Sequence, residues 1–122
     1  MEEKRRYIRL DTRLKITYTI VQQERSSRVT ETEDISGGGI RIFLMEQLPV
    51  GTLIRLTIHL PQDPTPVSCT GKVVWNEEFY ISPPEQKEGK VVEAGVEFTE
   101  IDPKDRDRII KYVILGYAAT NQ

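Results

Sequence analysis

The chain has 122 residues, of which 38% are hydrophobic and 30% charged, and its formal net charge is −2. This length suits one domain, and the composition is typical of a folded globular protein and not of a disordered one. No apolar run is long enough for a membrane span, and MEEKRRYIRL has charges where a secretory signal needs an apolar stretch, so we expect no such signal. The single cysteine, Cys69, cannot form an internal disulfide. We therefore expect a cytoplasmic protein.

The charge is unevenly distributed along the chain. Residues 1–15 carry six basic against three acidic side chains, so the remainder is acidic. A protein that binds long nucleic acid typically has a broad basic surface, which this composition does not support. A small basic patch favours a compact anion as a ligand. The basic residues are Lys4, Arg5, Arg6, Arg9, Arg13 and Lys15.

The first half of the chain predicts strands. Apolar residues alternate with polar ones over 10–23, which is typical of a half-buried strand, and a short exposed strand is expected over 28–34. The segment DISGGG at 34–39 interrupts regular structure, because glycine permits positive φ angles and close approach by another group. Alternation then predicts strands over 39–44 and 52–60.

The second half predicts two more strands and one helix. The strands are expected over 67–76 and 91–100, with Gly71 marking a bend or bulge in the first of them. Proline-rich and polar segments predict loops at 61–66 and 77–90. Asp102 followed by Pro103 is a helix start, and apolar residues at helical spacing then predict a helix over 103–119.

Six strands followed by one amphipathic helix predict an all-β fold with one helix. We expect a six-stranded antiparallel β-barrel with the C-terminal helix packed on it, because closure removes exposed strand edges. The whole chain, 1–122, is expected to be a single domain, with the barrel over 13–100. The sequence leaves open whether the helix packs on its own barrel or on a second copy, so monomer and dimer are both possible.

The sequence has few residues in patterns typical of catalytic or metal-binding sites. His59 falls out of phase with the inward residues of its predicted strand, so we expect it at the surface, and Cys69 is expected to fill space in the core. No metal-ligand spacing of cysteine or histidine occurs, and the carboxylates look like solvated surface. DISGGG lacks the GK[ST] ending of a phosphate-binding loop and precedes no helix. The sequence therefore predicts a protein that is not an enzyme and needs no cofactor or metal.

Two motifs make the chain resemble a known family. Arg5 and Arg9 form an R-x-x-x-R stretch ahead of the first long strand, and Asp34, Ser36 and Gly39 complete the D-x-S-x-x-G stretch of DISGGG. With GKVVW at 71–75 and AGVEFTEIDPKDRDRI at 94–109, this ordered set resembles the PilZ domain family, which comprises bacterial receptors for cyclic dimeric GMP (c-di-GMP). The resemblance covers about residues 4–115.

The resemblance implies a role for each motif residue. Arg5 and Arg9 would bind phosphate oxygens or the O6 and N7 edge of guanine, and a guanidinium plane can also stack on a base. Asp34 would accept hydrogen bonds from guanine N1–H and N2–H₂, and Ser36 would exchange a hydrogen bond with the ligand. Gly39 would let the backbone approach the ligand without a Cβ.

Five further residues are candidates for secondary ligand contacts. Gly37 and Gly38 share the argument made for the motif glycine, and Arg6 adds charge beside the arginine motif. Lys4 slightly favours an intercalated pair of ligands over a single one, because a cation there offsets four phosphates. Trp75, expected at the end of a strand, either borders the ligand or belongs to the core at the barrel edge.

The resemblance also implies a mode of action. Residues 1–12 would be a flexible segment that folds over ligand on the barrel and displays a new surface to a protein partner. Motility, biofilm formation and exopolysaccharide export are the pathways expected of such a receptor.

Two other functions are compatible with the sequence. One is a PilZ-like adaptor that contacts a partner protein without ligand. The other is a barrel that binds single-stranded nucleic acid, which needs exposed aromatic platforms along a basic groove. Aromatic residues make up only 7% of the chain, and Tyr18 and Phe98 are expected to face inward, so we expect no nucleic-acid partner.

Overall fold

The structure is a computed structural model that describes residues 7–23, 26–80 and 90–120. Seven strands precede one long helix, and a single turn of 3-10 helix, η1 (Val21–Gln23), follows the second strand. The strands and the helix are β1 (Leu10–Asp11), β2 (Lys15–Ile20), β3 (Ser27–Ile35), β4 (Gly39–Leu44), β5 (Leu53–Ile58), β6 (Val67–Tyr80), β7 (Lys90–Glu100) and α1 (Pro103–Thr120).

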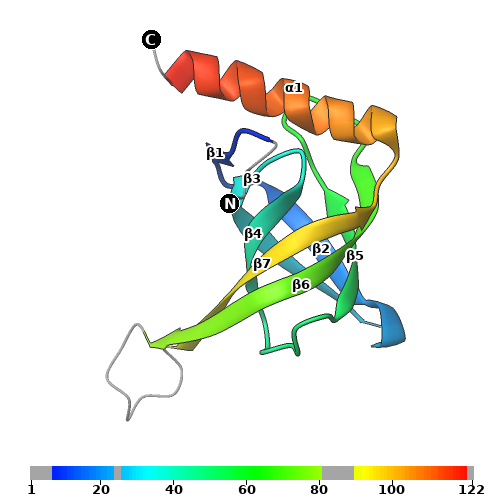
Figure 1. Ribbon diagram of the computed structural model, residues 1–122, viewed down its shortest axis with the longest axis vertical. Helices are drawn as coiled ribbons and strands as arrows, with labels where there is room; N and C mark the ends of the chain where they lie inside the picture. The colour runs from blue at the N-terminus through cyan, green and yellow to red at the C-terminus, as the bar shows by residue number, and fades with distance from the viewer. Residues whose placement is uncertain (1–6, 24–25, 81–89, 121–122) are drawn as a thin grey trace, which may run out of the picture.

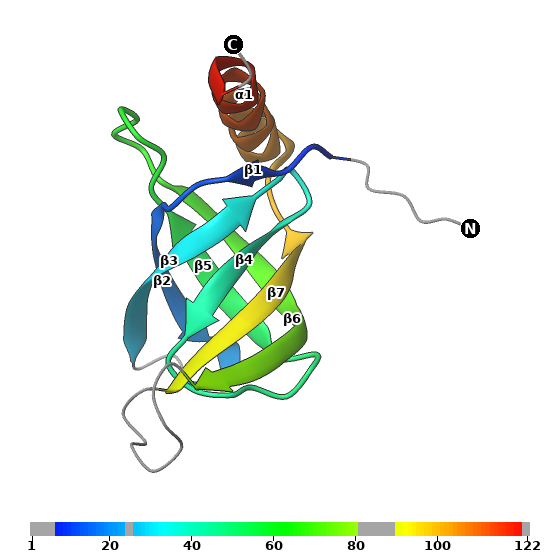
Figure 2. The same cartoon turned by 90° about the vertical axis from the view of Figure 1, so that its left-hand side faces the viewer.

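Six of the strands close into an antiparallel barrel (Figures 1 and 2). Their order is β3-β2-β5-β6-β7-β4, and a further pairing between β3 and β4 closes the circle. The predicted barrel with a C-terminal helix is thereby confirmed. The short strand β1 is an addition that the sequence did not indicate, and it pairs with the end of β3. It brings the N-terminal segment to the end of the barrel where β3 turns into β4.

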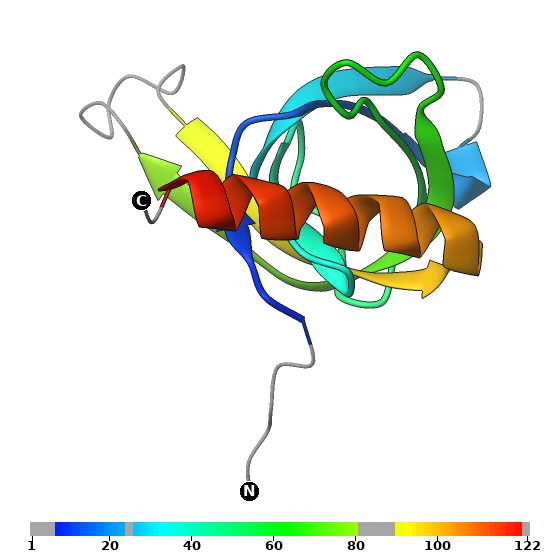
Figure 3. The same cartoon turned by 90° about the horizontal axis from the view of Figure 1, so that it is seen from above.

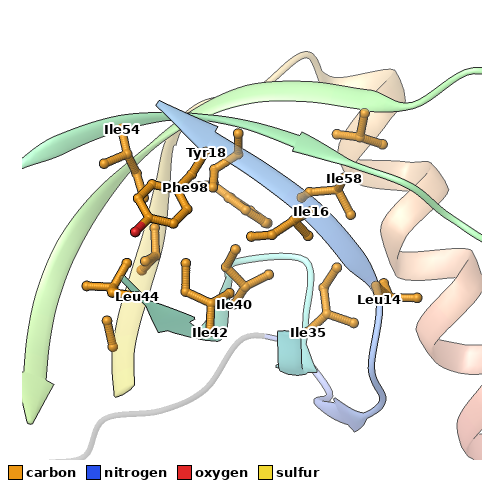
Figure 4. Packing of buried hydrophobic residues seen from close by; sticks show 14 of the residues in the cluster. Leu14, Ile16, Tyr18, Ile35, Ile40, Ile42, Leu44, Ile54, Ile58 and Phe98 are labelled. Carbon is orange, nitrogen blue, oxygen red and sulfur yellow. The ribbon is translucent and has the colours of Figure 1, made fainter. Parts of the chain in front are cut away.

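Alternation along the strands fills the barrel with branched apolar side chains (Figure 4). Tyr18 and Ile54 are fully buried, and Phe98 is 6% exposed, so the expected inward orientation of both aromatic residues is confirmed. The Tyr18 hydroxyl does not remain unpaired, because it accepts a hydrogen bond from the Met45 backbone N–H at 2.8 Å and donates one to Glu46 at 3.1 Å. The barrel is therefore a packed core and not a channel.

Helix α1 lies across one end of the barrel (Figure 3). It begins as predicted, because the Asp102 carboxylate accepts a hydrogen bond from the Lys104 backbone N–H at 2.8 Å and Pro103 takes the first helical position. Ile109 and Val113 on its apolar face are 0% and 2% exposed. The helix therefore packs on its own barrel.

The hairpin of β6 and β7 extends beyond the barrel wall (Figure 1). Residues 77–80, predicted to belong to a loop, are strand and pair with β7 as far as Lys90, whereas 81–89 lie outside the described residues. The prediction failed because Phe79 and Tyr80 are both exposed here, so no alternation marks the strand. The expected irregularity at Gly71 is confirmed by a shift of register beside it.

Candidate functional site

A pocket of about 580 Å³ opens at the end of the barrel beside the turn between β3 and β4. Its walls come from the N-terminal segment, from β3, β4 and their turn, and from the middle of β6 and β7. This volume is in the range of pockets that hold small molecules. Most of the sequence-predicted site residues that the structure describes line it, namely Arg9, Asp34, Ser36, Gly38, Gly39 and Trp75.

The two motifs meet in an ion pair. Arg9 Nη1 lies 3.0 Å from Asp34 Oδ1, although the two residues are 25 positions apart. The Asp34 side chain is 6% exposed, whereas that of Arg9 is 40% exposed and remains reachable from the pocket. The second oxygen, Asp34 Oδ2, lies 3.1 Å from Nε of Arg41 on β4. One buried carboxylate is thus held between two guanidinium groups.

Ser36 closes the turn between β3 and β4. Its backbone N–H donates to the Gly39 carbonyl at 2.9 Å, and its hydroxyl oxygen accepts from the Gly38 backbone N–H at 3.1 Å. The Gly38 carbonyl in turn accepts from the Phe98 backbone N–H at 2.9 Å, which ties the turn to β7. The Ser36 hydroxyl therefore orders the pocket wall through bonds within the protein.

The motif glycines are required by close approach and not by unusual φ angles. A Cβ at Gly39 would overlap the backbone carbonyl of Val96 on β7. Gly37 and Gly38 lie under the ring of Tyr7, and Gly37 faces the second, smaller pocket. Among the described glycines only Gly51 has a positive φ, so of the two properties that glycine permits in DISGGG the turn uses close approach.

Trp75 borders the pocket with a partly exposed ring. Its indole lies over Gly95 on β7, where a Cβ would collide with the ring, and the side chain is 38% exposed. The expectation that it ends a strand was wrong, because β6 continues to Tyr80. An aromatic face at the mouth of a polar pocket can stack on a planar ring such as a nucleobase.

The sequence profile of the PilZ domain matches residues 3–115. The chain belongs to the PilZ domain family. No curated protein sequence matches it closely enough to count as a relative.

Solved structures show the same fold. The Bacillus subtilis inhibitor of motility, MotI/DgrA, is 23% identical, with a TM-score of 0.77 over 99% of this chain and 55% of that one. The PilZ domain of Escherichia coli YcgR is 12% identical, with a TM-score of 0.70 over 97% of this chain and 95% of the other. Klebsiella (K. pneumonia) MrkH is 14% identical, with a TM-score of 0.77 over 99% and 53%. The chain thus spans about half the length of MotI/DgrA and MrkH.

Two residues of this PilZ domain join the site without having been singled out in the sequence. Tyr7 places its ring on Gly37 and Gly38, and its hydroxyl accepts a hydrogen bond from Arg106 of α1 at 3.4 Å. The Arg106 guanidinium also lies 5.7 Å from the centre of this ring. An aromatic residue inside the R-x-x-x-R stretch was the available signal. Arg41 carried no signal, because its role depends on the pairing of β4 with β3.

Other predicted residues lie apart from the pocket. Lys4, Arg5 and Arg6 fall outside the described residues. His59 is exposed, as expected, and Cys69 packs against the core, where burial raises the pKa of its thiol to about 12. Within residues 7–23, 26–80 and 90–120, no three metal-ligating side chains gather, and no helix is long and apolar enough to cross a membrane.

Proposed function

We propose that this PilZ domain is a bacterial receptor for c-di-GMP that binds and does not catalyse. The observation that carries the proposal is the meeting of Arg9 with Asp34 at the wall of a pocket that Trp75 also borders. Two relatives of the same fold, E. coli YcgR and Klebsiella MrkH, are described as complexes with c-di-GMP. These descriptions support the choice of ligand.

The pocket groups match the chemistry of the ligand. c-di-GMP is a ring with two phosphates and two guanines, so it offers negative charge, planar faces and the donor pair N1–H and N2–H₂. Asp34 has two acceptor oxygens for that donor pair, and Arg9 has five donors for a phosphate or for guanine O6 and N7. The partly exposed indole of Trp75 adds a face for stacking.

Binding then requires an exchange of partners at Asp34. In the structure Arg9 occupies Asp34 Oδ1, which the guanine edge would need. Arg9 would move to the ligand, and Arg5 of the same motif would join it. The Arg9–Asp34 ion pair therefore competes with the guanine edge for Asp34. Its opening would be the first step of the proposed response, in which residues 1–12 reorder over the ligand and a protein partner binds the new surface.

The partner and the pathway follow by analogy with the relatives. MotI/DgrA is described as an inhibitor of motility and MrkH as a c-di-GMP-dependent transcription regulatory factor. We infer that this chain also acts through a macromolecular target in motility or biofilm control and contributes no chemistry of its own.

Calorimetric titration with c-di-GMP tests the proposal. We expect saturable binding by the wild type and binding at least tenfold weaker in Arg9→Ala, because a charge-assisted contact contributes on the order of 1.5–3 kcal/mol. Arg13→Ala is the matched control, since Arg13 pairs with Glu31 and faces Phe43 away from the pocket lining. GTP should not bind.

Thermal stability gives a second reading. At about 100 µM, roughly a hundred times a micromolar Kd, the ligand should stabilise the fold by about 2.7 kcal/mol. Neither heat nor a shift in melting temperature at this concentration would overturn the receptor function and leave the ligand-independent adaptor as the better hypothesis.

A further inference from the structure

Asp34, the carboxylate proposed to bind the guanine edge, has a second ion-pair partner. Arg41 lies opposite Asp34 in the pairing of β4 with β3, and its Nε is 3.1 Å from Asp34 Oδ2. Arg9 holds the other oxygen. If Arg9 moves to the ligand, Arg41 is the described cation that stays with Asp34. Its backbone is fixed in a central part of the sheet, between β3 and β7.

Arg41 is itself held by two more carboxylates. Its guanidinium nitrogens lie 4.0 Å from Glu33 on β3 and 4.0 Å from Glu93 on β7, and both carboxylate side chains are about one-fifth exposed. Glu33 is the extra residue of a bulge in β3, since the register shifts between Thr32 and Asp34. Glu33 and Glu93 thus share one guanidinium, and the nearby charge of Glu93 favours the protonated form of Glu33.

We propose that Arg41 is a positioning residue that keeps the Asp34 carboxylate aimed at the guanine edge, and that the Glu33–Glu93 pair behind it takes up a proton when c-di-GMP binds. The proposal rests on the receptor function proposed above. It assigns no ligand contact to Glu33 or Glu93. Their part is to compensate the charge that binding changes at Asp34.

The direction of the coupling follows from the charges that face Glu33. Three described side chains act on it, namely Glu93 from β7, Arg41 from β4 and Asp34 from β3; Asp11 of β1 lies opposite Asp34 and also lines the pocket. Moving Arg9 to the ligand leaves the charge of Asp34, which acts on Glu33, without its Arg9 partner, and the ligand brings two negative phosphates. Both changes favour the protonated form of Glu33.

The coupling falls in an accessible pH range. Burial, followed by the hydrogen bond and the charge of Glu93, raises the pKa of Glu33 from 4.5 to about 7, whereas Arg41 opposes the rise. The group is thus partly protonated near neutrality in the free protein, and a further rise on binding means proton uptake. Affinity should therefore fall as pH rises through 7, by at most tenfold per pH unit.

The experiment is a calorimetric titration of the full chain with c-di-GMP at pH 6, 7 and 8.5, repeated at pH 7 in two buffers of different ionisation enthalpy. We expect the wild type to take up a fraction of one proton and to bind several-fold to tenfold more weakly at pH 8.5 than at pH 6. Glu33→Gln should bind with an affinity independent of pH. Glu31→Gln, two positions away and exposed, is the matched control and should behave as the wild type. His59, the single histidine, lies outside the pocket lining.

Variants at Arg41 separate a positioning role from a purely structural one. We expect Arg41→Ala to bind tenfold or more weakly and to melt at a lower temperature, because three carboxylates lose a shared cation, and Arg41→Lys to recover part of the affinity. Wild-type binding with a constant affinity and no proton uptake would overturn the inference while leaving the receptor function in place. A pH dependence retained in Glu33→Gln would also overturn it. An absence of wild-type binding at every pH would remove the receptor function itself. The buffer comparison needs no variant, so a misfolded mutant does not affect it.

Discussion

Two of the contacts that attach helix α1 to the rest of the molecule differ in kind. Near its start, Arg108 pairs with Asp63 of the loop between β5 and β6 at 2.7 Å and with Asp105 at 2.8 Å, and it also donates to the Thr65 carbonyl. We call this set the clamp. On the N-terminal segment, Tyr7 lies on the turn between β3 and β4 and bonds to Arg106, and we call this contact the latch.

The difference lies in what a ligand can disturb. None of the clamp residues lines the large pocket, whereas Tyr7 of the latch does, two positions from Arg9. Under the proposed function, a ligand that draws Arg9 away from Asp34 would pull on the latch and leave the clamp in place. The helix could then stay docked through the clamp while the latch opens or closes with ligand binding.

The strongest way to break the comparison is to remove what both attachments depend on. Ile109, a residue of α1, is fully buried in the core. We expect Ile109→Ala to lower the free energy of unfolding by about 3 kcal/mol, because it leaves a cavity in the core. Urea denaturation measures the loss. Leu115→Ala is the control on the same helix, since Leu115 is 64% exposed, and it should change stability by no more than about 0.5 kcal/mol.

Removing the latch alone should have a smaller effect. We expect Tyr7→Ala to cost about 1 kcal/mol of stability and to increase hydrogen exchange at Gly37 and Gly38, which the ring covers. Tyr7→Phe keeps the ring and loses only the long bond to Arg106, so its exchange should stay near that of the wild type. Equal exchange in both variants would contradict the latch.

Removing the clamp should affect stability and not ligand affinity. Arg108→Ala leaves Asp63 and Asp105 unpaired, so we expect a lower melting temperature at pH 7 with an unchanged Kd for c-di-GMP. Hydrogen bonding to Arg108 lowers the pKa of Asp63, so the stabilisation is present above the usual aspartate value of 3.8 and is lost as pH falls through the lowered value. Melting curves of both proteins should therefore converge in acid. A changed Kd at pH 7 would show that the clamp is not independent of the pocket.

The smallest effect is expected at Cys69, whose alkylation rate tests whether the clamp opens. This thiol packs against the core near Asp105 and Arg106, and burial, followed by the charge of Asp105, raises its pKa to about 12. Alkylation at pH 8 should thus be on the order of a hundredfold slower than that of a free thiol. Saturating c-di-GMP should leave the rate unchanged, whereas Arg108→Ala should increase it. A rate that responds to ligand would mean that both attachments open together.

The sequence predicted those parts of the fold that follow from local patterns. Alternation with β-branched residues identified the barrel strands, and Asp102 with Pro103 identified the helix start, because these signals act within a few residues. The extension of β6 past Asn76 was missed, since it continues where both faces of the hairpin meet solvent. The two-residue strand β1 was also missed, because such a short element is stabilised only by its partner β3.

The site was predicted in part for a similar reason. The motifs identified Arg9, Asp34 and the turn residues, but Arg41 and Tyr7 join them only through barrel closure and the bulge at Glu33. A bulge shifts the register by one residue, which no alternating pattern reveals. Gly39 illustrates the converse, because its lack of a side chain is demanded by Val96 across the sheet. The glycine at this motif position is therefore required by the fold, whether or not it contacts a ligand.

Trp75 is the single tryptophan of the chain, and it lies at the pocket mouth with more than a third of its side chain exposed. The chain therefore carries one indole fluorophore, and under the proposed function that fluorophore is placed where an incoming purine would stack. Emission from the unlabelled wild type can report site occupancy in real time, free of background from other indoles. If the proposed reordering takes place, the same ring allows its kinetics to be followed by stopped flow without an attached dye.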